Sequence, residues 1–130
     1  MRKTFLGNTG TPTAPVENTF LAALPADLRA KMKSCTKYSD NTGGNSSSSS
    51  AVTATTDYLF LLAEYEVFGT RTNANTAEQN SQVQYSYFKA GNPWTAGSWE
   101  TPATTLYWWL RSVYAGNGVS FCRVGTSSAS

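Results

Sequence analysis

Glu64 and Glu66 have the spacing in this sequence that comes closest to a pair of catalytic carboxylates. In an extended strand, residues two apart point to the same face, so the two groups could share a cation or raise the pKa of one of them. The alternative is structural: the acids cap the end of a segment or form ion pairs with Arg71 or Arg111. We favour the structural alternative, because acid pairs are also common outside active sites.

Other groups that carry chemistry are scarce. The chain has no histidine, which removes the commonest general base and the commonest metal ligand. Its two cysteines, Cys35 and Cys122, cannot build a tetrahedral zinc site on their own. They can form one disulfide or stay free as small apolar side chains, and we favour two buried free thiols.

The recognisable catalytic and metal-binding motifs are missing from the sequence. Asp40, Asn41 and Asn45 could supply oxygen ligands to calcium, but no glutamate closes a loop of EF-hand spacing. The sequence also lacks a glycine-rich phosphate loop, a GxSxG nucleophile elbow and an HExxH motif, and its serines have no histidine partner. We therefore predict that the chain is not an enzyme and holds neither a metal nor a cofactor.

Aromatic side chains offer the chemistry of binding instead. Rings can stack on sugars, bases or protein surfaces, and the residues available for this are Trp94, Trp99, Tyr107, Trp108, Trp109 and Tyr114. The alternative is a core, in which strand alternation places Trp108 and Leu110 on one face and Trp109 on the other. We favour the core, with Tyr114 exposed and Arg111 paired with a carboxylate or an aromatic ring. The predicted core residues are Leu61, Trp108, Trp109, Leu110 and Phe121.

The first third of the chain predicts two short helices. Asn18 is a suitable N-cap for the first helix. Pro25 interrupts that helix and can start a second helical turn that runs to Met32. The i, i+4 spacing of Leu24, Leu28 and Met32 predicts a stripe that faces the core.

The middle of the chain predicts a loop, two strands and a helix. Residues 39–51 are rich in Ser, Gly and Asn and predict a flexible surface loop. Residues 52–55 predict a short strand, and the continuous apolar run 58–62 predicts a strand that is buried on both faces. A longer helix is predicted over 75–90, with Gly91 as its C-terminal stop.

The last quarter of the chain predicts a pair of strands. Two apolar, aromatic-rich runs, 106–112 and 119–124, flank residues 113–118. Within the flanked segment, Asn117 and Gly118 suit backbone positions with positive φ, so the region predicts a β-hairpin or a close strand pair. Such a pair is typical of a scaffold that displays a loop.

Composition favours one domain over residues 1–130. Hydrophobic content is 40%, charged content is a low 14%, and the net charge is +2. The cations are scattered, and the one cluster, over 29–37, lies at the end of a predicted helix, where cations complement the helix dipole. We therefore predict no nucleic-acid partner. We also predict no membrane insertion, because no stretch is long and apolar enough to span a bilayer. The N-terminus lacks the apolar core of a signal peptide, and localisation stays open.

Several stretches together resemble a family of bacterial and phage domains of unknown function. The stretches are 20–28, 38–41, 59–69, 78–80 and 85–91, and the most specific is Trp108–Ser112 (WWLRS) with Phe121–Val124 (FCRV). Domains of this family look C-type-lectin-like and resemble formylglycine-generating enzymes and retroelement-diversified variable proteins.

Two departures from the family pattern bear on the fold. The family usually has proline where this chain has Val113, which implies a less rigid turn. Family members also carry a strand before the position of Met1 and a closing strand after that of Ser130. The resemblance therefore implies either a fragment truncated at both ends or a domain with an open, unpaired edge.

The sequence thus predicts an α+β, C-type-lectin-like domain with short helices on a small antiparallel sheet. The expected function is non-catalytic ligand binding or display in a phage or bacterial surface protein, with a protein or glycan on a cell surface as partner. The predicted contact residues are Val113, Tyr114, Ala115, Asn117, Ser120, Arg123 and Thr126. One alternative is a structural module of a larger virion or surface protein with no ligand. Another is an enzyme of the formylglycine-generating type, but Cys35 and Cys122 lack a recognisable active-site context for bound copper.

Overall fold

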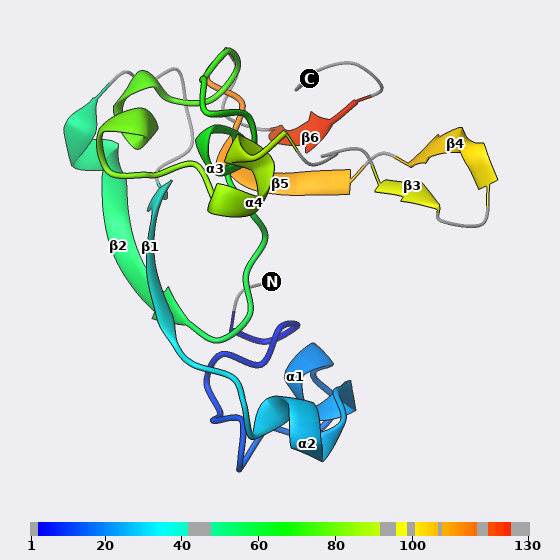
Figure 1. Ribbon diagram of the computed structural model, residues 1–130. Helices are drawn as coiled ribbons and strands as arrows, with labels where there is room; N and C mark the ends of the chain where they lie inside the picture. Colours follow the sequence, from blue (N-terminus) through cyan, green and yellow to red (C-terminus); the bar gives the residue numbers. More distant parts are fainter. Residues whose placement is uncertain are drawn as a thin grey trace. The chain divides into compact units, whose positions relative to one another are not determined.

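The computed structural model describes residues 3–41, 48–91, 96–98, 101–106, 108–116 and 120–125. The chain forms two compact units, one of residues 1–37 and 55–60 and the other of residues 38–54 and 61–130. Short helices and two-stranded sheets make up the fold, which is therefore α+β, as the sequence predicts (Figure 1).

All regular elements in the described part of the chain are short. The helices are α1 (Phe20–Ala23), α2 (Ala26–Arg29), α3 (Glu64–Phe68) and α4 (Ser86–Lys89), with the 3-10 turns η1 (Ser49–Ala51) and η2 (Thr76–Asn80). The strands are β1 (Cys35–Asp40), β2 (Val52–Asp57), β3 (Ala96–Ser98), β4 (Thr101–Leu106), β5 (Trp108–Val113) and β6 (Phe121–Val124). β1 pairs with β2, and β3–β4 and β5–β6 are antiparallel pairs. Elements this short need tertiary contacts to persist.

The two predicted helices of the first unit are present but shorter. Thr19, not Asn18, caps α1, since its side chain accepts a hydrogen bond from the Ala22 N–H at 3.3 Å. Asn18 has a φ of 60° and so lies outside the helix. Pro25 precedes α2, as expected, but α2 is a single turn and Leu28 is 50% exposed. The predicted core stripe is wrong, because residues four apart share a face only while the helix continues.

The apolar run 58–62 is not a strand. The Asn8 Oδ1 accepts hydrogen bonds from the Tyr58 and Leu59 N–H groups at 2.9 and 3.0 Å, and the Asn8 Nδ2 donates to the Leu59 carbonyl at 2.6 Å. This side chain supplies the partners that a neighbouring strand would otherwise offer. The predicted strand 52–55 is present as β2 and extends to Asp57.

The predicted helix over 75–90 is also wrong, because η2 and α4 replace it with an extended segment between them. In that segment the Tyr85 N–H donates to the Glu66 carbonyl at 3.0 Å, and the Gln82 side chain donates to the Tyr38 carbonyl at 2.9 Å. These contacts replace helical hydrogen bonds, and the Asn and Ser residues within 75–90 have little helix propensity of their own.

The predicted loop 39–51 is too long at both ends. Ser39 and Asp40 belong to β1 and are buried, and residues 49–51 form η1. The Asp40 N–H donates to the Glu78 carboxylate at 2.9 Å, which fixes the end of β1. Residues 42–47 of the predicted loop lie outside the described residues.

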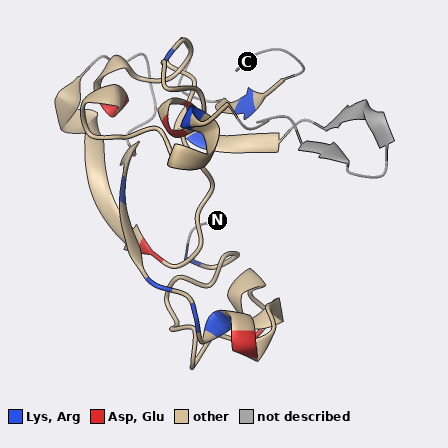
Figure 2. Cartoon of the chain, viewed as in Figure 1, with Lys and Arg blue, Asp and Glu red and all other residues tan. Residues whose placement is uncertain are grey.

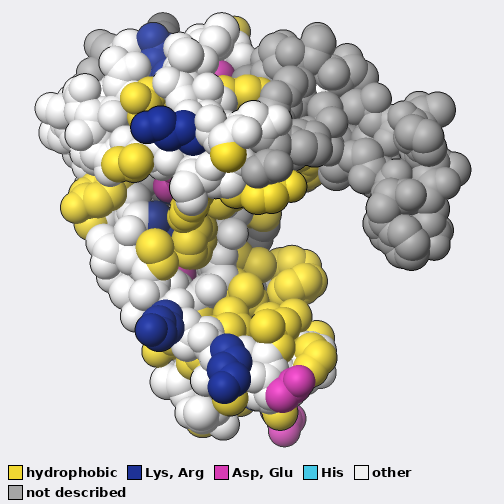
Figure 3. Space-filling model, viewed as in Figure 1, with side chains coloured by type: hydrophobic (Ala, Val, Ile, Leu, Met, Phe, Trp, Pro, Cys, Tyr) yellow, Lys and Arg dark blue, Asp and Glu magenta, His cyan; other side chains and the backbone are white. Residues whose placement is uncertain are grey.

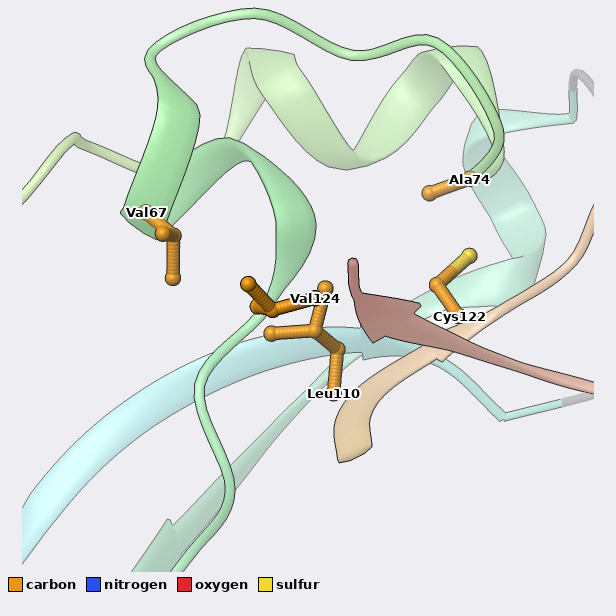
Figure 4. Packing of buried hydrophobic residues seen from close by; sticks show 5 residues of the cluster. All are labelled: Val67, Ala74, Leu110, Cys122 and Val124. Atoms are coloured by element: carbon orange, nitrogen blue, oxygen red, sulfur yellow. The ribbon is translucent and has the colours of Figure 1, made fainter. Parts of the chain in front are cut away.

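The core of the second unit lies between α3 and the β5–β6 pair (Figure 4). Its buried side chains point toward one another and come from Val67, Ala74, Leu110, Cys122 and Val124. Half-buried side chains pack around them, from Leu62, Phe68, Phe88 and Trp108. Ala74 comes from the segment before η2, so this core joins that segment to the strand pair.

The predicted core residues have different degrees of burial. Leu110 is fully buried, and Leu61 and Trp108 are half-buried. Trp109 and Phe121 are 59% and 50% exposed, so their assignment to the core is wrong. The reason is that Trp109 and Phe121 alternate with Leu110, Cys122 and Val124, which are buried in the core, so their side chains point away from that core.

Charged residues are dispersed along the described part of the chain (Figure 2). Within each unit, the Lys and Arg side chains seen in Figure 3 form separate spots among uncharged side chains, not one continuous area. Among the helices of the described residues, none has the length and apolar content needed to cross a membrane.

Candidate functional site

The outward face of the β5–β6 pair carries exposed aromatic and cationic side chains. In the strand register, Trp109 lies opposite Arg123, and Val113 lies opposite Phe121. Trp109, Phe121 and Arg123 are exposed, and Val113 is half-buried. We call these four residues the strand face: two large rings, one guanidinium and one aliphatic side chain on one side of a strand pair.

The register of the pair shifts between Trp109 and Val113. Within this stretch the Arg111 N–H donates to the Leu62 carbonyl at 2.9 Å, which lies outside the sheet. A register shift of this kind re-aims the side chains beyond it. The shift thus helps to set which residues the strand face presents.

The turn beside the strand face is held at its base. The Tyr114 N–H donates to the Ser120 carbonyl at 2.8 Å, and the Ala115 N–H donates to the Asn73 carbonyl at the same distance. Tyr114 also forms an isolated antiparallel bridge with Ala74. A Cβ at Gly116 would lie 2.6 Å from the Tyr114 ring, so the small residue lets the ring pack against the backbone.

Glu64 fixes the segment 72–74, which supports the turn. The Glu64 carboxylate is buried and accepts hydrogen bonds from three successive backbone N–H groups, those of Thr72, Asn73 and Ala74, at 2.7–3.1 Å. A carboxylate that accepts several backbone donors forms strong, charge-assisted hydrogen bonds. Glu64 therefore organises a loop, and it holds that loop against the turn.

A chain of buried polar groups links Glu64 to β1 and β5. The Glu64 N–H donates to the Ser112 Oγ at 3.0 Å, and the Ser112 hydroxyl donates to the Glu78 carboxylate at 2.7 Å. The other Glu78 oxygen accepts the Asp40 N–H, and an Asp40 oxygen accepts from the Asn75 side chain at 2.9 Å. Burial raises the pKa of the Glu78 carboxyl, against the smaller opposing effect of its hydrogen bonds.

Arg111 and Glu66 form a largely buried ion pair. The two guanidinium Nη atoms donate to the two Glu66 oxygens at 2.6 and 2.5 Å. Arg111 also donates to the Ser39 hydroxyl and to the Leu61 and Tyr38 carbonyls. Glu66 accepts the Ala63 N–H at 3.0 Å at the start of α3. The structural interpretation of Glu66 and the predicted partner for Arg111 are both confirmed.

The structure describes five of the seven predicted contact residues. Tyr114, Ser120 and Arg123 are exposed, and Val113 and Ala115 are half-buried. The other two, Asn117 and Thr126, lie outside the described residues. Sequence reasoning missed Trp109 and Phe121 as surface residues. Strand alternation places Trp109 and Leu110 on different faces of β5. With Leu110 in the core, that alternation is the signal that identifies Trp109 as a surface residue.

The cysteines are free but differ in environment. Cys35 is exposed and Cys122 is buried, so only one of the two predicted buried thiols is buried. Burial, with smaller contributions from Glu64 and Glu78, raises the pKa of the Cys122 thiol to about 12. Among the described residues, no group of three or more acids and cysteines is arranged to hold a metal ion.

The profile of a family described as "Domain of unknown function (DUF6273)" matches residues 11–129. This match covers nearly all of the chain, so the chain belongs to that family. It bears out the resemblance to a domain-of-unknown-function family. No curated protein and no solved structure is significantly similar to the chain.

Proposed function

We propose that this chain is a non-catalytic binding or display domain of a phage or bacterial surface protein. Its binding surface would be the strand face together with the adjoining residues Tyr114 and Ser120. The observation that carries the proposal is that Trp109 and Phe121 are 59% and 50% exposed on a strand pair whose other face is buried. Large exposed rings are enriched at binding surfaces.

The chemistry of the strand face fits a protein or a glycan. An aromatic ring packs against the apolar face of a sugar or against an apolar side chain. Arg123, opposite Trp109 in the register, would add hydrogen bonds to hydroxyl or carboxylate oxygens. The dispersed cations of the described residues give no support to a nucleic-acid ligand. In this proposal the family has a C-type-lectin-like fold that presents the face.

The support beneath the face fits a display function. The turn is bonded to the 72–75 segment, and Glu64 fixes that segment through three backbone hydrogen bonds. A surface that is ordered before binding loses less conformational entropy when a ligand arrives. The arrangement would allow the exposed side chains to vary while the buried acids hold the scaffold.

A glycan array and a panel of intact bacterial cells would test the proposal. The wild-type chain should bind a subset of these, and a Trp109→Ser, Arg123→Ser double variant should bind at least about tenfold more weakly, the loss expected of a binding hot spot. The matched control is Val83→Ser, an apolar residue that is 79% exposed outside the face. Equal losses in the control and the double variant would refute the face.

The alternative is a structural module of a larger virion or surface protein with no ligand of its own. One observation favours it: large apolar side chains are also exposed elsewhere, with Val83 79%, Phe5 60% and Tyr87 56% exposed. Such residues would be covered in a larger assembly. Natural variants distinguish the two functions, because variation concentrated on residues 109–126 supports binding and even variation over the surface supports a structural part.

A further inference from the structure

Lys37 of β1 and Asp57 of β2 form an oppositely charged pair in the interior of the first unit. Lys37 is 5% exposed and Asp57 is 1% exposed. The Lys37 Nζ contacts an Asp57 carboxylate oxygen and donates to the Thr55 Oγ1 at 2.7 Å. The Phe60 ring covers the amine, with its centroid 5.3 Å from Nζ. A primary amine is thus held against a carboxyl group, away from water.

Burial of this kind removes the solvation of both charged groups. Removing an ammonium and a carboxylate from water is costly, and transfer of one proton from Nζ to the carboxylate gives an amine and a carboxylic acid instead. A neutral amine is a nucleophile, and a protonated carboxyl can lose its hydroxyl as water. The same contact that makes an ion pair therefore also places the reactants of an amide bond together.

We propose that Lys37 and Asp57 condense to an intramolecular isopeptide bond that joins β1 to β2. The neutral Nζ attacks the Asp57 Cγ and forms a C–N bond. The Cγ–OH bond then breaks, and the hydroxyl leaves with a proton from the nitrogen as one molecule of water. The product is an uncharged secondary amide, and no oxidant or other reactant is required.

Two features of the site favour the condensation over the reverse reaction. Holding the reacting groups in contact gives an effective concentration far above any that free molecules reach. The near-complete burial of Asp57 limits access of water to the amide once it has formed. The remaining amide hydrogen can keep the bond to the Thr55 Oγ1, so the product leaves no new polar group without a partner.

Intact-mass spectrometry of the folded 130-residue chain tests the proposal. The expected mass is lower than the sequence mass by one water, and it stays lower in strong denaturant. Trypsin should fail to cut after Lys37, and because Arg71 is the next trypsin site, one peptide of residues 34–71 should replace the peptides 34–37 and 38–71. That peptide should also lack one water.

Two variants give matched controls. Lys37→Arg keeps the positive charge but replaces the nucleophile, so its mass should equal the sequence mass. Asp57→Asn should lose ammonia instead of water, because the amide nitrogen is then the leaving group. A wild-type chain at its full sequence mass overturns the proposal. Loss of water with normal cleavage after Lys37 also overturns it, because that pattern marks a succinimide at an aspartate.

Discussion

Replacing Glu64 by glutamine should loosen the segment that supports the turn. The Glu64 carboxylate accepts three backbone N–H groups, with one oxygen bonded to Thr72 and Asn73 and the other to Asn73 and Ala74. A glutamine keeps the size of the side chain but has only one acceptor oxygen. Its NH₂ group would face at least one backbone donor, so that donor would lose its partner in a buried site.

The expected cost follows from these contacts. Hydrogen bonds to charged groups contribute about 1.5–3 kcal/mol each, and an unsatisfied buried donor adds to the loss, so Glu64→Gln should lower the free energy of unfolding by about 2–4 kcal/mol. With a urea m-value of about 2 kcal/mol/M, the middle of the usual range for small proteins, the unfolding midpoint should fall by roughly 1–2 M. Such a loss is a large fraction of the stability of an ordinary domain.

Urea titration and hydrogen exchange together measure this effect. Exchange should become faster at the Thr72, Asn73 and Ala74 amides and at the Ala115 amide, which donates to the Asn73 carbonyl. The matched control is Glu17→Gln, an exposed glutamate in the first unit, which should change stability by no more than about 0.5 kcal/mol. If Glu64→Gln behaves like this control, the assigned role of the Glu64 carboxylate is wrong.

Three further predictions follow from the buried groups. Arg111→Lys should lower the free energy of unfolding by about 2–4 kcal/mol in urea, because lysine cannot form two parallel bonds to Glu66, and an unchanged midpoint would contradict this. Burial raises the Glu78 pKa, so the folded chain binds that proton more tightly than the unfolded chain does. As the pH rises from below 4.5, the ordinary pKa of a glutamate, through the raised pKa, the wild-type chain should therefore lose stability relative to the Glu78→Gln variant. If the urea midpoints of the two chains change with pH in the same way, this prediction is wrong. At neutral pH a thiol reagent should modify exposed Cys35 rapidly and Cys122 only after unfolding, and fast modification of both would contradict the burial.

The β5–β6 pair can be predicted from the sequence because its signals lie within one short stretch of the chain. Alternating residues of β5 and a turn sequence are enough to bring two neighbouring strands together. The same alternation did not say which face is buried. Leu110 and Trp109 are both apolar, and the inward face was decided by Val67 and Ala74, which come from a distant part of the chain. For this reason the sequence predicts Trp109 in the core, whereas the folded chain exposes it.

The helix predicted over 75–90 failed for a related reason. Its apolar spacing is compatible with a helix, but the Tyr85 amide and the Gln82 side chain bond to residues of α3 and β1. Contacts of this kind override a weak helix propensity, and no sequence window contains both partners. The role of Glu66 could be predicted as a class, since an acid near a segment end is often a cap, but its pairing with Arg111 as opposed to Arg71 required the fold.

The buried acids of the second unit take the place of regular secondary structure. In the described part of the chain no helix or strand exceeds six residues, so many backbone N–H groups have no helical or sheet partner. Glu64, Glu66 and Glu78 accept such groups directly, and they do so at sites that link α3, β1 and β5. Acids that are engaged in this way are poor candidates for catalysis, because their lone pairs already have fixed donors. The strand face, in contrast, presents the exposed rings of Trp109 and Phe121, and for this reason the search for function should begin there.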